Sequence, residues 1–286
     1  MKDQAQALAS GLYVVATPIG NLEDLGFRAL RVLQHASWIA AEDTRQTRKL
    51  LDHYGLSTEL RSLHEHSTNA RIEELVTSLK GGAVGAYVSD AGTPGLCDPG
   101  PSLVAACVRM GIPVFPVPGA SAALALLSVS GFSESAFHFY GFFPREKKER
   151  EEWAAKTAAA GGLAIFFESP HRIQGALAFL AERFPEAPLV VGRELTKRFE
   201  TVSRGTCGDL AESLGKEEPR GEYVLALHLP AGAEKAGLET GEIEALVKEL
   251  ALLGAPQKAL VRAAMSHGMR KNEAYRLALE AHKGET

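Results

Sequence analysis

Four polar or glycine-rich segments of this sequence contain residue types that can bind or act on a small ligand, and each follows an apolar run. These segments are "ATPIGNLEDL", "AEDTR", "SDAGTPG" and "FESPHR". In open α/β sheets, ligands bind beyond the carboxyl ends of the strands. We therefore expect these segments to line a ligand crevice.

The stretch "AYVSDAGTPGLCDPG" (86–100) has an acid and glycines where a strand should end, but no phosphate-binding lysine. Asp90 can accept hydrogen bonds from a ribose diol or an amine, and Gly92 and Gly95 let the backbone approach a ligand closely. GxGxxG, GxxxxGK[ST], HExxH and GxSxG motifs are absent from the sequence, which weakens dinucleotide, P-loop, zincin and hydrolase interpretations. A nucleoside ligand without phosphates fits this stretch, and a purely structural turn is the alternative.

Metal and thiol chemistry have little support in the sequence. His64 and His66 of "HEH" can share one face of a strand, but no third ligand follows at a useful spacing, so we predict no metal. Cys97, Cys107 and Cys207 form neither a CxxC pair nor an even framework. We expect reduced thiols, with Cys97 packed rather than nucleophilic.

The composition is that of an ordinary globular chain. It has 286 residues, of which 45% are hydrophobic and 23% charged, enough for one large or two moderate domains. The start lacks the apolar core of a signal peptide, and "AALALLSV" (122–129) is far shorter than a membrane span. We therefore expect a soluble cytoplasmic protein without membrane association.

Charge is unevenly distributed along the chain. The net charge of −4 argues against a surface that binds nucleic acid indiscriminately. Residues 256–283 nevertheless carry six basic and two acidic side chains, a local balance of +4. Shorter basic clusters occur at 144–150 and 192–204. Each cluster suits either nucleic-acid contact or a solvated surface.

Apolar runs of strand length alternate with helical patterns up to residue 230. The runs are "LYVVAT", "SWIAAED", "VGAYVSD", "PVFPVPG", "FHFYGFF", "LAIFFES", "PLVVGRE" and "YVLALHL". This alternation predicts parallel or mixed sheets covered by helices. Because about eight strands exceed one small sheet, we predict an α/β fold of two lobes.

We predict four parts along the chain. An N-terminal α/β lobe spans 1–122, a C-terminal α/β lobe spans 123–230, a linker spans 231–241, and a helical tail spans 242–286. The linker is small, polar and glycine-bearing. The last two helical patterns of the tail have a helix-turn-helix outline, which suits a structural cap or dimer contact as well as nucleic-acid binding.

Eight ordered motifs carry a resemblance to a known family. They are "ATPIGNLEDL", "AEDTRQTRKLL", "SDAGTPGLCDPG", "VPGASA", "GFFPR", "FFESPHR", "GRELTKRFE" and "RGTCGDL". Together they resemble the tetrapyrrole-methylase-like class of S-adenosylmethionine-dependent methyltransferases, and within it the branch called ribosomal RNA small subunit methyltransferase I. That branch methylates a cytidine 2′-hydroxyl in 16S ribosomal RNA. The resemblance runs from about Gly11 to Thr286.

The resemblance implies S-adenosylmethionine as cofactor, bound in a cleft between the two lobes. Carried over by motif, the cofactor-binding residues are Thr17, Pro18, Ile19, Gly20, Asn21, Asp90, Ala91, Gly92, Thr93, Ser121, Ala122, Phe143 and Pro144. The partner implied is 16S ribosomal RNA within the small ribosomal subunit, and members of the family tend to form homodimers.

Transfer of a methyl group to a ribose hydroxyl requires an in-line arrangement and assistance with loss of the hydroxyl proton. Candidate catalytic carboxylates are Glu42, Asp43 and Glu168, with a structural role such as a helix cap as the alternative. Candidate RNA-binding residues are Arg45, Arg172, Arg193, Lys197, Arg198 and Arg204, with surface ion pairing as the alternative.

Two other functions remain open at this point. The first is methylation of a tetrapyrrole or another small molecule on the same fold, which needs no basic tail. The second is a non-catalytic RNA-binding or ribosome-assembly module. The sequence does not identify the general base, the nucleotide methylated, the form of the substrate, or the role of the tail.

Overall fold

The structure is a computed structural model that describes residues 7–64, 67–97, 100–216, 218–230, 240–253, 255–266, 269 and 271–283. Two compact units make up the chain: residues 1–143 with 164–227, and residues 144–163 with 228–286. In the described part of the chain, no helix combines the length and the apolar character needed to cross a membrane.

The first sheet is parallel and has the strand order β3-β2-β4-β1-β5. Its elements and their connections are β1 (Gly11–Val15), the short 3-10 helix η1 (Leu22–Asp24), α1 (Phe27–His35), β2 (Trp38–Ala41), α2 (Thr44–His53), β3 (Leu60–Ser62), α3 (Asn69–Lys80), β4 (Val84–Val88), α4 (Pro101–Arg109) and β5 (Val114–Val117). Because parallel strands all end at one edge, the loops after β1, β2, β4 and β5 lie near one another.

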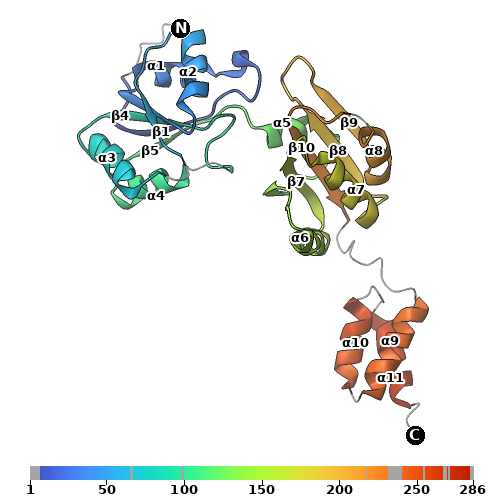
Figure 1. The fold of residues 1–286 in the computed structure, drawn as a ribbon. Coiled ribbons are helices and arrows are strands. Elements are labelled where there is room, and N and C mark those ends of the chain that lie inside the picture. The colour runs from blue at the N-terminus through green and yellow to red at the C-terminus, as the bar shows by residue number, and fades with distance from the viewer. Residues whose placement is uncertain are drawn as a thin grey trace. The chain divides into compact units, whose positions relative to one another are not determined.

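Helices cover both faces of this sheet, as Figure 1 shows. On one face, Tyr13, Val15, Ile39 and Val88 pack with side chains of α1 and α2. On the other face, their strand neighbours pack with side chains of α3 and α4. Since successive strand residues point to opposite faces, a strand buried on both faces reads as a continuous apolar run.

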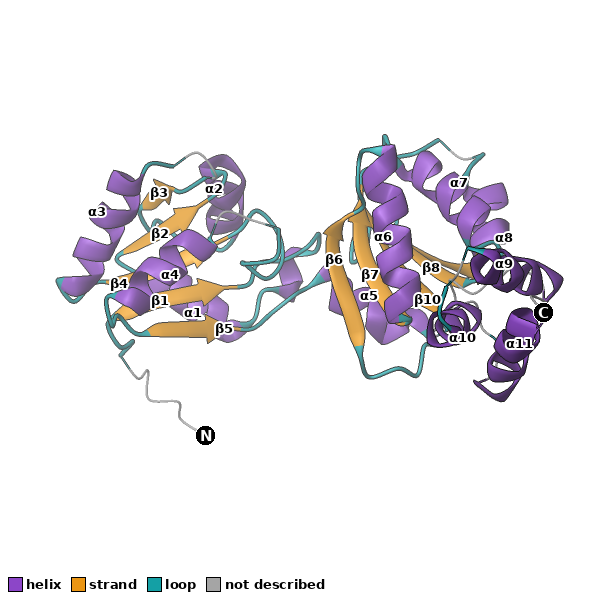
Figure 2. Ribbon diagram, turned by 90° about the horizontal axis from the view of Figure 1, so that it is seen from below, coloured by secondary structure: helices purple, strands orange, loops and turns teal. Residues whose placement is uncertain are grey.

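The second sheet has the strand order β6-β7-β10-β8-β9, and Figure 2 shows its strands in orange. Its elements are α5 (Ala122–Ser130), β6 (Phe137–Phe142), α6 (Lys147–Ala160), β7 (Gly162–Glu168), α7 (Ile173–Arg183), β8 (Pro188–Arg193), β9 (Thr201–Thr206), α8 (Cys207–Leu214) and β10 (Tyr223–Leu229). Strand β8 pairs antiparallel with both β9 and β10.

The tail consists of α9 (Thr240–Leu252), α10 (Gln257–Ser266) and α11 (Lys271–Lys283), which pack around an apolar core of their own. Val247, Leu260 and Ala274 are fully buried in that core. Helix α9 begins within the predicted linker, of which residues 231–239 lie outside the described residues. The predicted turn between α10 and α11 also lies largely outside them.

The predicted fold class is confirmed: two sheets with covering helices, followed by a helical tail. Each of the eight apolar runs coincides with a strand, to within one residue at the start. Helix α3 begins after Thr68, whose hydroxyl accepts the N–H of Arg71, and ends at Lys80, with Gly81 as its C-cap. The predicted strands do not include β3 and β9, which are edge strands without buried residues and therefore lack the apolar pattern from which strands are predicted.

Candidate functional site

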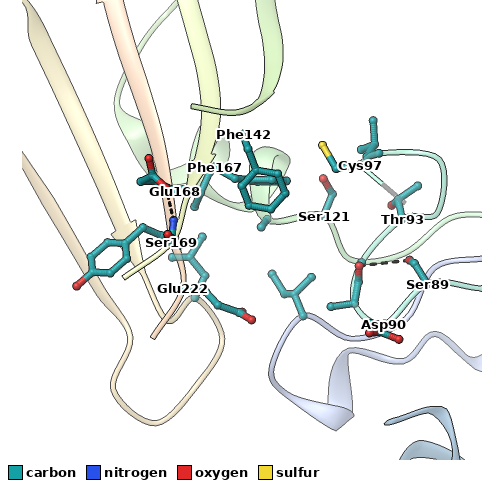
Figure 3. A pocket seen from close by; sticks show the side chains of 18 of the residues that line it. Ser89, Asp90, Thr93, Cys97, Ser121, Phe142, Phe167, Glu168, Ser169 and Glu222 are labelled. Atoms are coloured by element: carbon teal, nitrogen blue, oxygen red, sulfur yellow. Dashed lines mark hydrogen bonds between the residues drawn. The ribbon is translucent and has the colours of Figure 1, made fainter. Parts of the chain in front are cut away.

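A cavity of about 360 Å³ lies in the larger unit, a size within the usual range for small-ligand sites. Figure 3 shows it from close by. It is lined by Ile19, Glu42, Ser89, Asp90, Ala91, Gly92, Thr93, Leu96, Cys97, Ser121, Ala122, Phe142, Phe167, Glu168, Ser169, Pro170, Leu195, Glu222, Tyr223 and Val224. We call it the first cavity. Loops from the edge of the first sheet and residues of the second sheet both contribute to its wall.

The loop after β4 is held to the loop after β1 by paired backbone hydrogen bonds. The N–H of Thr17 donates to the carbonyl of Gly92 at 2.9 Å, and the N–H of Gly92 donates back at 3.0 Å. Gly92 has φ +79°, a left-handed conformation that glycine adopts without a steric cost. The hydroxyl of Thr93 donates to the carbonyl of Ala120 at 3.0 Å, which ties this loop to the segment before α5. Three sheet-edge loops are thereby fixed together.

Acidic side chains dominate the polar part of the first cavity. Its lining contains four carboxylates, those of Glu42, Asp90, Glu168 and Glu222, and none of its described lining residues is a lysine or arginine. Asp90 is exposed and accepts the backbone N–H of Asp43 at 2.9 Å, so one of its oxygens links the β2 and β4 loops. A wall of this kind favours a cationic ligand over an anionic one.

Aromatic rings supply the apolar wall opposite Asp90. Phe142 is 57% exposed, and its ring meets that of Phe167 edge-on at 5.7 Å between centroids. Its neighbour Phe143, which the motif match suggested, is 1% exposed and packs against Phe166 instead. Successive side chains of an extended segment point in opposite directions, so the cavity is lined by Phe142 and not by its neighbour Phe143.

Glu168 and Arg172 form a buried ion pair behind the cavity wall. The Glu168 side chain has no exposed surface, and one of its oxygens accepts Arg172 Nε at 2.8 Å and Nη2 at 2.6 Å. Arg172 also donates to the carbonyl of Phe143 at 3.1 Å, and the same Glu168 oxygen accepts the N–H of Ser169 at 2.6 Å. The pair thus joins the end of β6 to the start of α7.

Asp43 caps helix α2. Its carboxylate accepts the backbone N–H of Arg45 at 2.8 Å and pairs with the guanidinium of the same residue at 2.6 Å. These hydrogen bonds from Arg45 lower the pKa of Asp43 to about 2. Glu42, one residue earlier, lines the first cavity.

The predicted cofactor residues divide between two cavities. Ile19, Asp90 and Ala91 line both the first cavity and a second cavity, described below. Gly92, Thr93, Ser121 and Ala122 line the first cavity only, and Thr17, Pro18 and Gly20 the second only. Asn21, Phe143 and Pro144 line neither, and Asn21 caps the short helix η1 by accepting the N–H of Glu23.

Most of the predicted RNA-binding side chains have partners within the chain. Arg45 and Arg172 are in the ion pairs described above. Arg193 donates to the carbonyl of Arg220, and Arg204 donates to the carbonyl of Val129. The ammonium group of Lys197 lies between Glu194 and Glu222. Arg198 is exposed, and its guanidinium lies over the ring of Phe199 at 5.4 Å. Contact of any of these residues with RNA stays a prediction.

No group of three histidine, cysteine or acidic side chains in the described part of the chain is placed to hold a metal ion. His66 lies outside the described residues, so the predicted histidine pair has no structural description.

Sequence reasoning missed several lining residues of the second half, among them Phe142, Phe167, Leu195 and Tyr223. Phe142 and Phe167 belong to "GFFPR" and "FFESPHR", so the motifs indicated the segments but not which side chain points inward. Leu195 belongs to "GRELTKRFE", so that motif too indicated the segment but not the side chain. Tyr223 begins β10, which carries no distinctive motif, and nothing in its local sequence signals a ligand.

The sequence profile described as "Tetrapyrrole (Corrin/Porphyrin) Methylases" matches residues 11–211. The chain therefore belongs to the tetrapyrrole methylase family.

Within that family, the chain is similar to proteins named Ribosomal RNA small subunit methyltransferase I. The protein of that name from Neisseria meningitidis serogroup A is 44% identical over 270 residues, which cover 94% of this chain and 92% of that protein. The one from Escherichia coli O157:H7 is 42% identical over 275 residues, covering 94% of each chain.

Solved structures of more distant sequence share the fold. A crystal structure of diphthine synthase has a TM-score of 0.62 at 14% identity and covers 76% of this chain and 89% of its own. A uroporphyrin-III C-methyltransferase from Thermus thermophilus, complexed with S-adenosylhomocysteine, has a TM-score of 0.53 at 18% identity, covering 76% and 97%.

Proposed function

We propose that this protein is an S-adenosylmethionine-dependent methyltransferase that methylates the ribose 2′-hydroxyl of a cytidine in 16S ribosomal RNA. The observation that carries the proposal is the first cavity, which is acidic, partly aromatic, and built on the loop that contains Asp90 and Gly92. The specific reaction is proposed by similarity to relatives that are 39 to 45% identical.

The residues of the first cavity suit this cofactor. S-adenosylmethionine carries two positive charges, on its sulfonium and ammonium groups, and one negative charge, on its carboxylate. It has no phosphate. Asp90 in the wall favours its positive charges, whereas the charges of Glu168 and Glu222 are balanced by Arg172 and Lys197. Among the predicted residues, Asp90, Gly92, Thr93, Ser121 and Ala122 would hold it, and the ring of Phe142 would pack against it.

Most of the remaining predicted residues contribute indirectly in this proposal, whereas Ile19 and Ala91 line the first cavity directly. Thr17, Pro18, Ile19, Gly20 and Asn21 form and support the loop after β1, and Thr17 anchors the Gly92 turn. Phe143 and Pro144 follow Phe142 and would fix the position of its ring.

The cofactor, when bound, supplies an activated methyl group. The protein's own part is to hold the ribose hydroxyl in line and to accept its proton. We propose Glu42 as the acceptor, because it lines the first cavity and directly follows β2, the strand next to β4, while Asp90 lies in the loop after β4. Asp43 and Glu168 are engaged with Arg45 and Arg172, so we propose that these two carboxylates position the site.

An RNA substrate is favoured over a tetrapyrrole by the tail. The family profile ends at residue 211, before β10 and α9 to α11. The structural relatives cover 76 to 79% of this chain, whereas the ribosomal RNA methyltransferases cover 87 to 96%.

The predicted boundaries, with lobes at 1–122 and 123–230 and a tail at 242–286, belong to this proposal, as do the cytoplasmic location and the homodimer.

The test is methyl transfer from labelled S-adenosylmethionine to small ribosomal subunits from a bacterial strain that lacks such an enzyme. Naked 16S RNA is assayed in parallel, and the label is located by nuclease mapping. We expect one 2′-O-methylcytidine. Label in a base, or label only in an added tetrapyrrole, would refute the proposed reaction. Absence of cofactor binding at millimolar concentration would indicate an RNA-binding module without catalysis.

A further inference from the structure

The second cavity has a volume of about 510 Å³ and adjoins the first. It is lined by Thr17, Pro18, Ile19, Gly20, Leu22, Gln46, Thr47, Lys49, Leu50, Ser89, Asp90, Ala91, Lys197 and Glu222. Five of these residues, Ile19, Ser89, Asp90, Ala91 and Glu222, also line the first cavity. A group bound in the second cavity would therefore lie next to a cofactor bound in the first.

The two cavities differ in charge. The described lining of the first includes no lysine or arginine, whereas the second includes Lys49 and Lys197 beside the carboxylates of Asp90 and Glu222. The second cavity therefore contains ammonium groups that the first lacks, and an ammonium group there that is not paired with a carboxylate can accept an anionic group close to the proposed methyl donor.

The charge of Lys197 is already balanced within the chain. Its ammonium group lies 2.8 Å from Glu194 and 3.0 Å from Glu222. Although partial burial opposes the effect, these hydrogen bonds hold the pKa of Lys197 above its usual value. Its aliphatic stem lies against Gly20, at a place where a Cβ would clash. Lys197 thus connects the β8–β9 loop to the loop after β1, and its charge is not available to a ligand.

Lys49 is in a different situation. It is exposed on α2, and its ammonium group donates to the neutral side-chain oxygen of Gln46 at 3.1 Å. Within the described residues no carboxylate pairs with it. Gln46 lies one turn earlier on the helix and also lines the second cavity. A flexible ammonium group beside an amide is a combination that binds a single phosphate oxygen well.

We propose that Lys49 and Gln46 form a phosphate-binding site for the RNA strand, which holds the phosphate adjacent to the target ribose in the second cavity. The inference rests on the proposed function, because the shared wall of the two cavities matters only if a methyl group is transferred across it. Lys49 supplies the charge, and Gln46 fixes the position of the ammonium group.

The test compares Lys49→Gln with Lys80→Gln. Lys80 is a matched control because it is also exposed on a helix, donates to a neutral atom, Met110 Sδ at 3.5 Å, and lines neither cavity. Binding of each variant to small ribosomal subunits is measured between 50 and 300 mM salt, with Lys49→Arg as a charge-retaining variant.

We expect Lys49→Gln to bind the subunit about 5- to 10-fold more weakly at 0.1 M salt and to lower the salt slope by about one. S-adenosylmethionine affinity and the melting temperature should not change. Lys49→Arg should keep the wild-type slope, and Lys80→Gln should match the wild type throughout.

Two outcomes would overturn the inference: a wild-type slope for Lys49→Gln, or equal weakening by the Lys49 and Lys80 variants, which would indicate an effect of net charge alone. Failure of the proposed function is distinguishable, because the wild-type protein would then transfer no methyl group to RNA at any salt concentration.

Discussion

Glu168→Gln should strongly destabilise the larger unit. The substitution keeps the shape of the side chain but removes the charge that balances Arg172, inside a wall where the glutamate is completely buried. Breaking a buried pair by removing one partner costs about 3 to 5 kcal/mol. The Arg172 side chain keeps 23% of its surface exposed, so water offsets part of the loss and we expect about 3 kcal/mol.

For a unit of this size, about 3 kcal/mol corresponds to a fall of roughly 6 to 12 °C in the melting temperature. The assay is thermal and urea unfolding of the full chain, followed by circular dichroism, for Glu168→Gln, Arg172→Met and the double variant. Removing both charges leaves no uncompensated ion, so the double variant should recover at least about 2 kcal/mol relative to the sum of the single changes.

Additive effects, within about 0.5 kcal/mol, would refute the reasoning, because two residues that act as a pair cannot contribute independently. A stable Glu168→Gln variant would do the same.

Three further predictions concern the first cavity and α2. Gly92→Ala should weaken S-adenosylmethionine binding several-fold, as measured by calorimetry. Alanine at φ +79° is strained by about 1 to 2 kcal/mol, and its methyl group would lie 3.3 Å from Ile19. An unchanged affinity would contradict this role of Gly92. Cys97 is exposed in the first cavity rather than packed as the sequence analysis expected, whereas Cys107 and Cys207 are buried. Burial raises the pKa of Cys107 to about 11 and that of Cys207 to about 12. Iodoacetamide at pH 8 should therefore modify Cys97 alone, and the cofactor should slow the reaction. Hydrogen bonds from Arg45 lower the pKa of Asp43 from 3.8 to about 2. The wild type should therefore be more stable than Asp43→Asn by its full margin above pH 5, and this margin should shrink as the pH falls from 4 to 2. A difference in melting temperature that stays constant over this pH range would contradict the assignment.

Local sequence was sufficient to predict most of the fold. In the first sheet, the apolar runs that became strands are continuous because both faces of the sheet are covered. The caps of α3 and the Gly92 turn are also local, since each depends on the conformation of one or two residues. The short polar strands β3 and β9 were missed because pairing at a sheet edge leaves little trace in side-chain hydrophobicity.

The sequence by itself determined that segments rich in Asp, Gly, Thr and Pro end several strands, and it determined which family these motifs resemble. Tertiary structure decided which side chains meet. It placed Phe142 rather than Phe143 in the first cavity, and it brought Arg172 to the carbonyl of Phe143 and Lys197 to the carboxylate of Glu222. The physical reason is that a hydrogen bond or an ion pair depends on distances of about 3 Å, and such distances between residues far apart in sequence exist only after the sheets and their loops have packed.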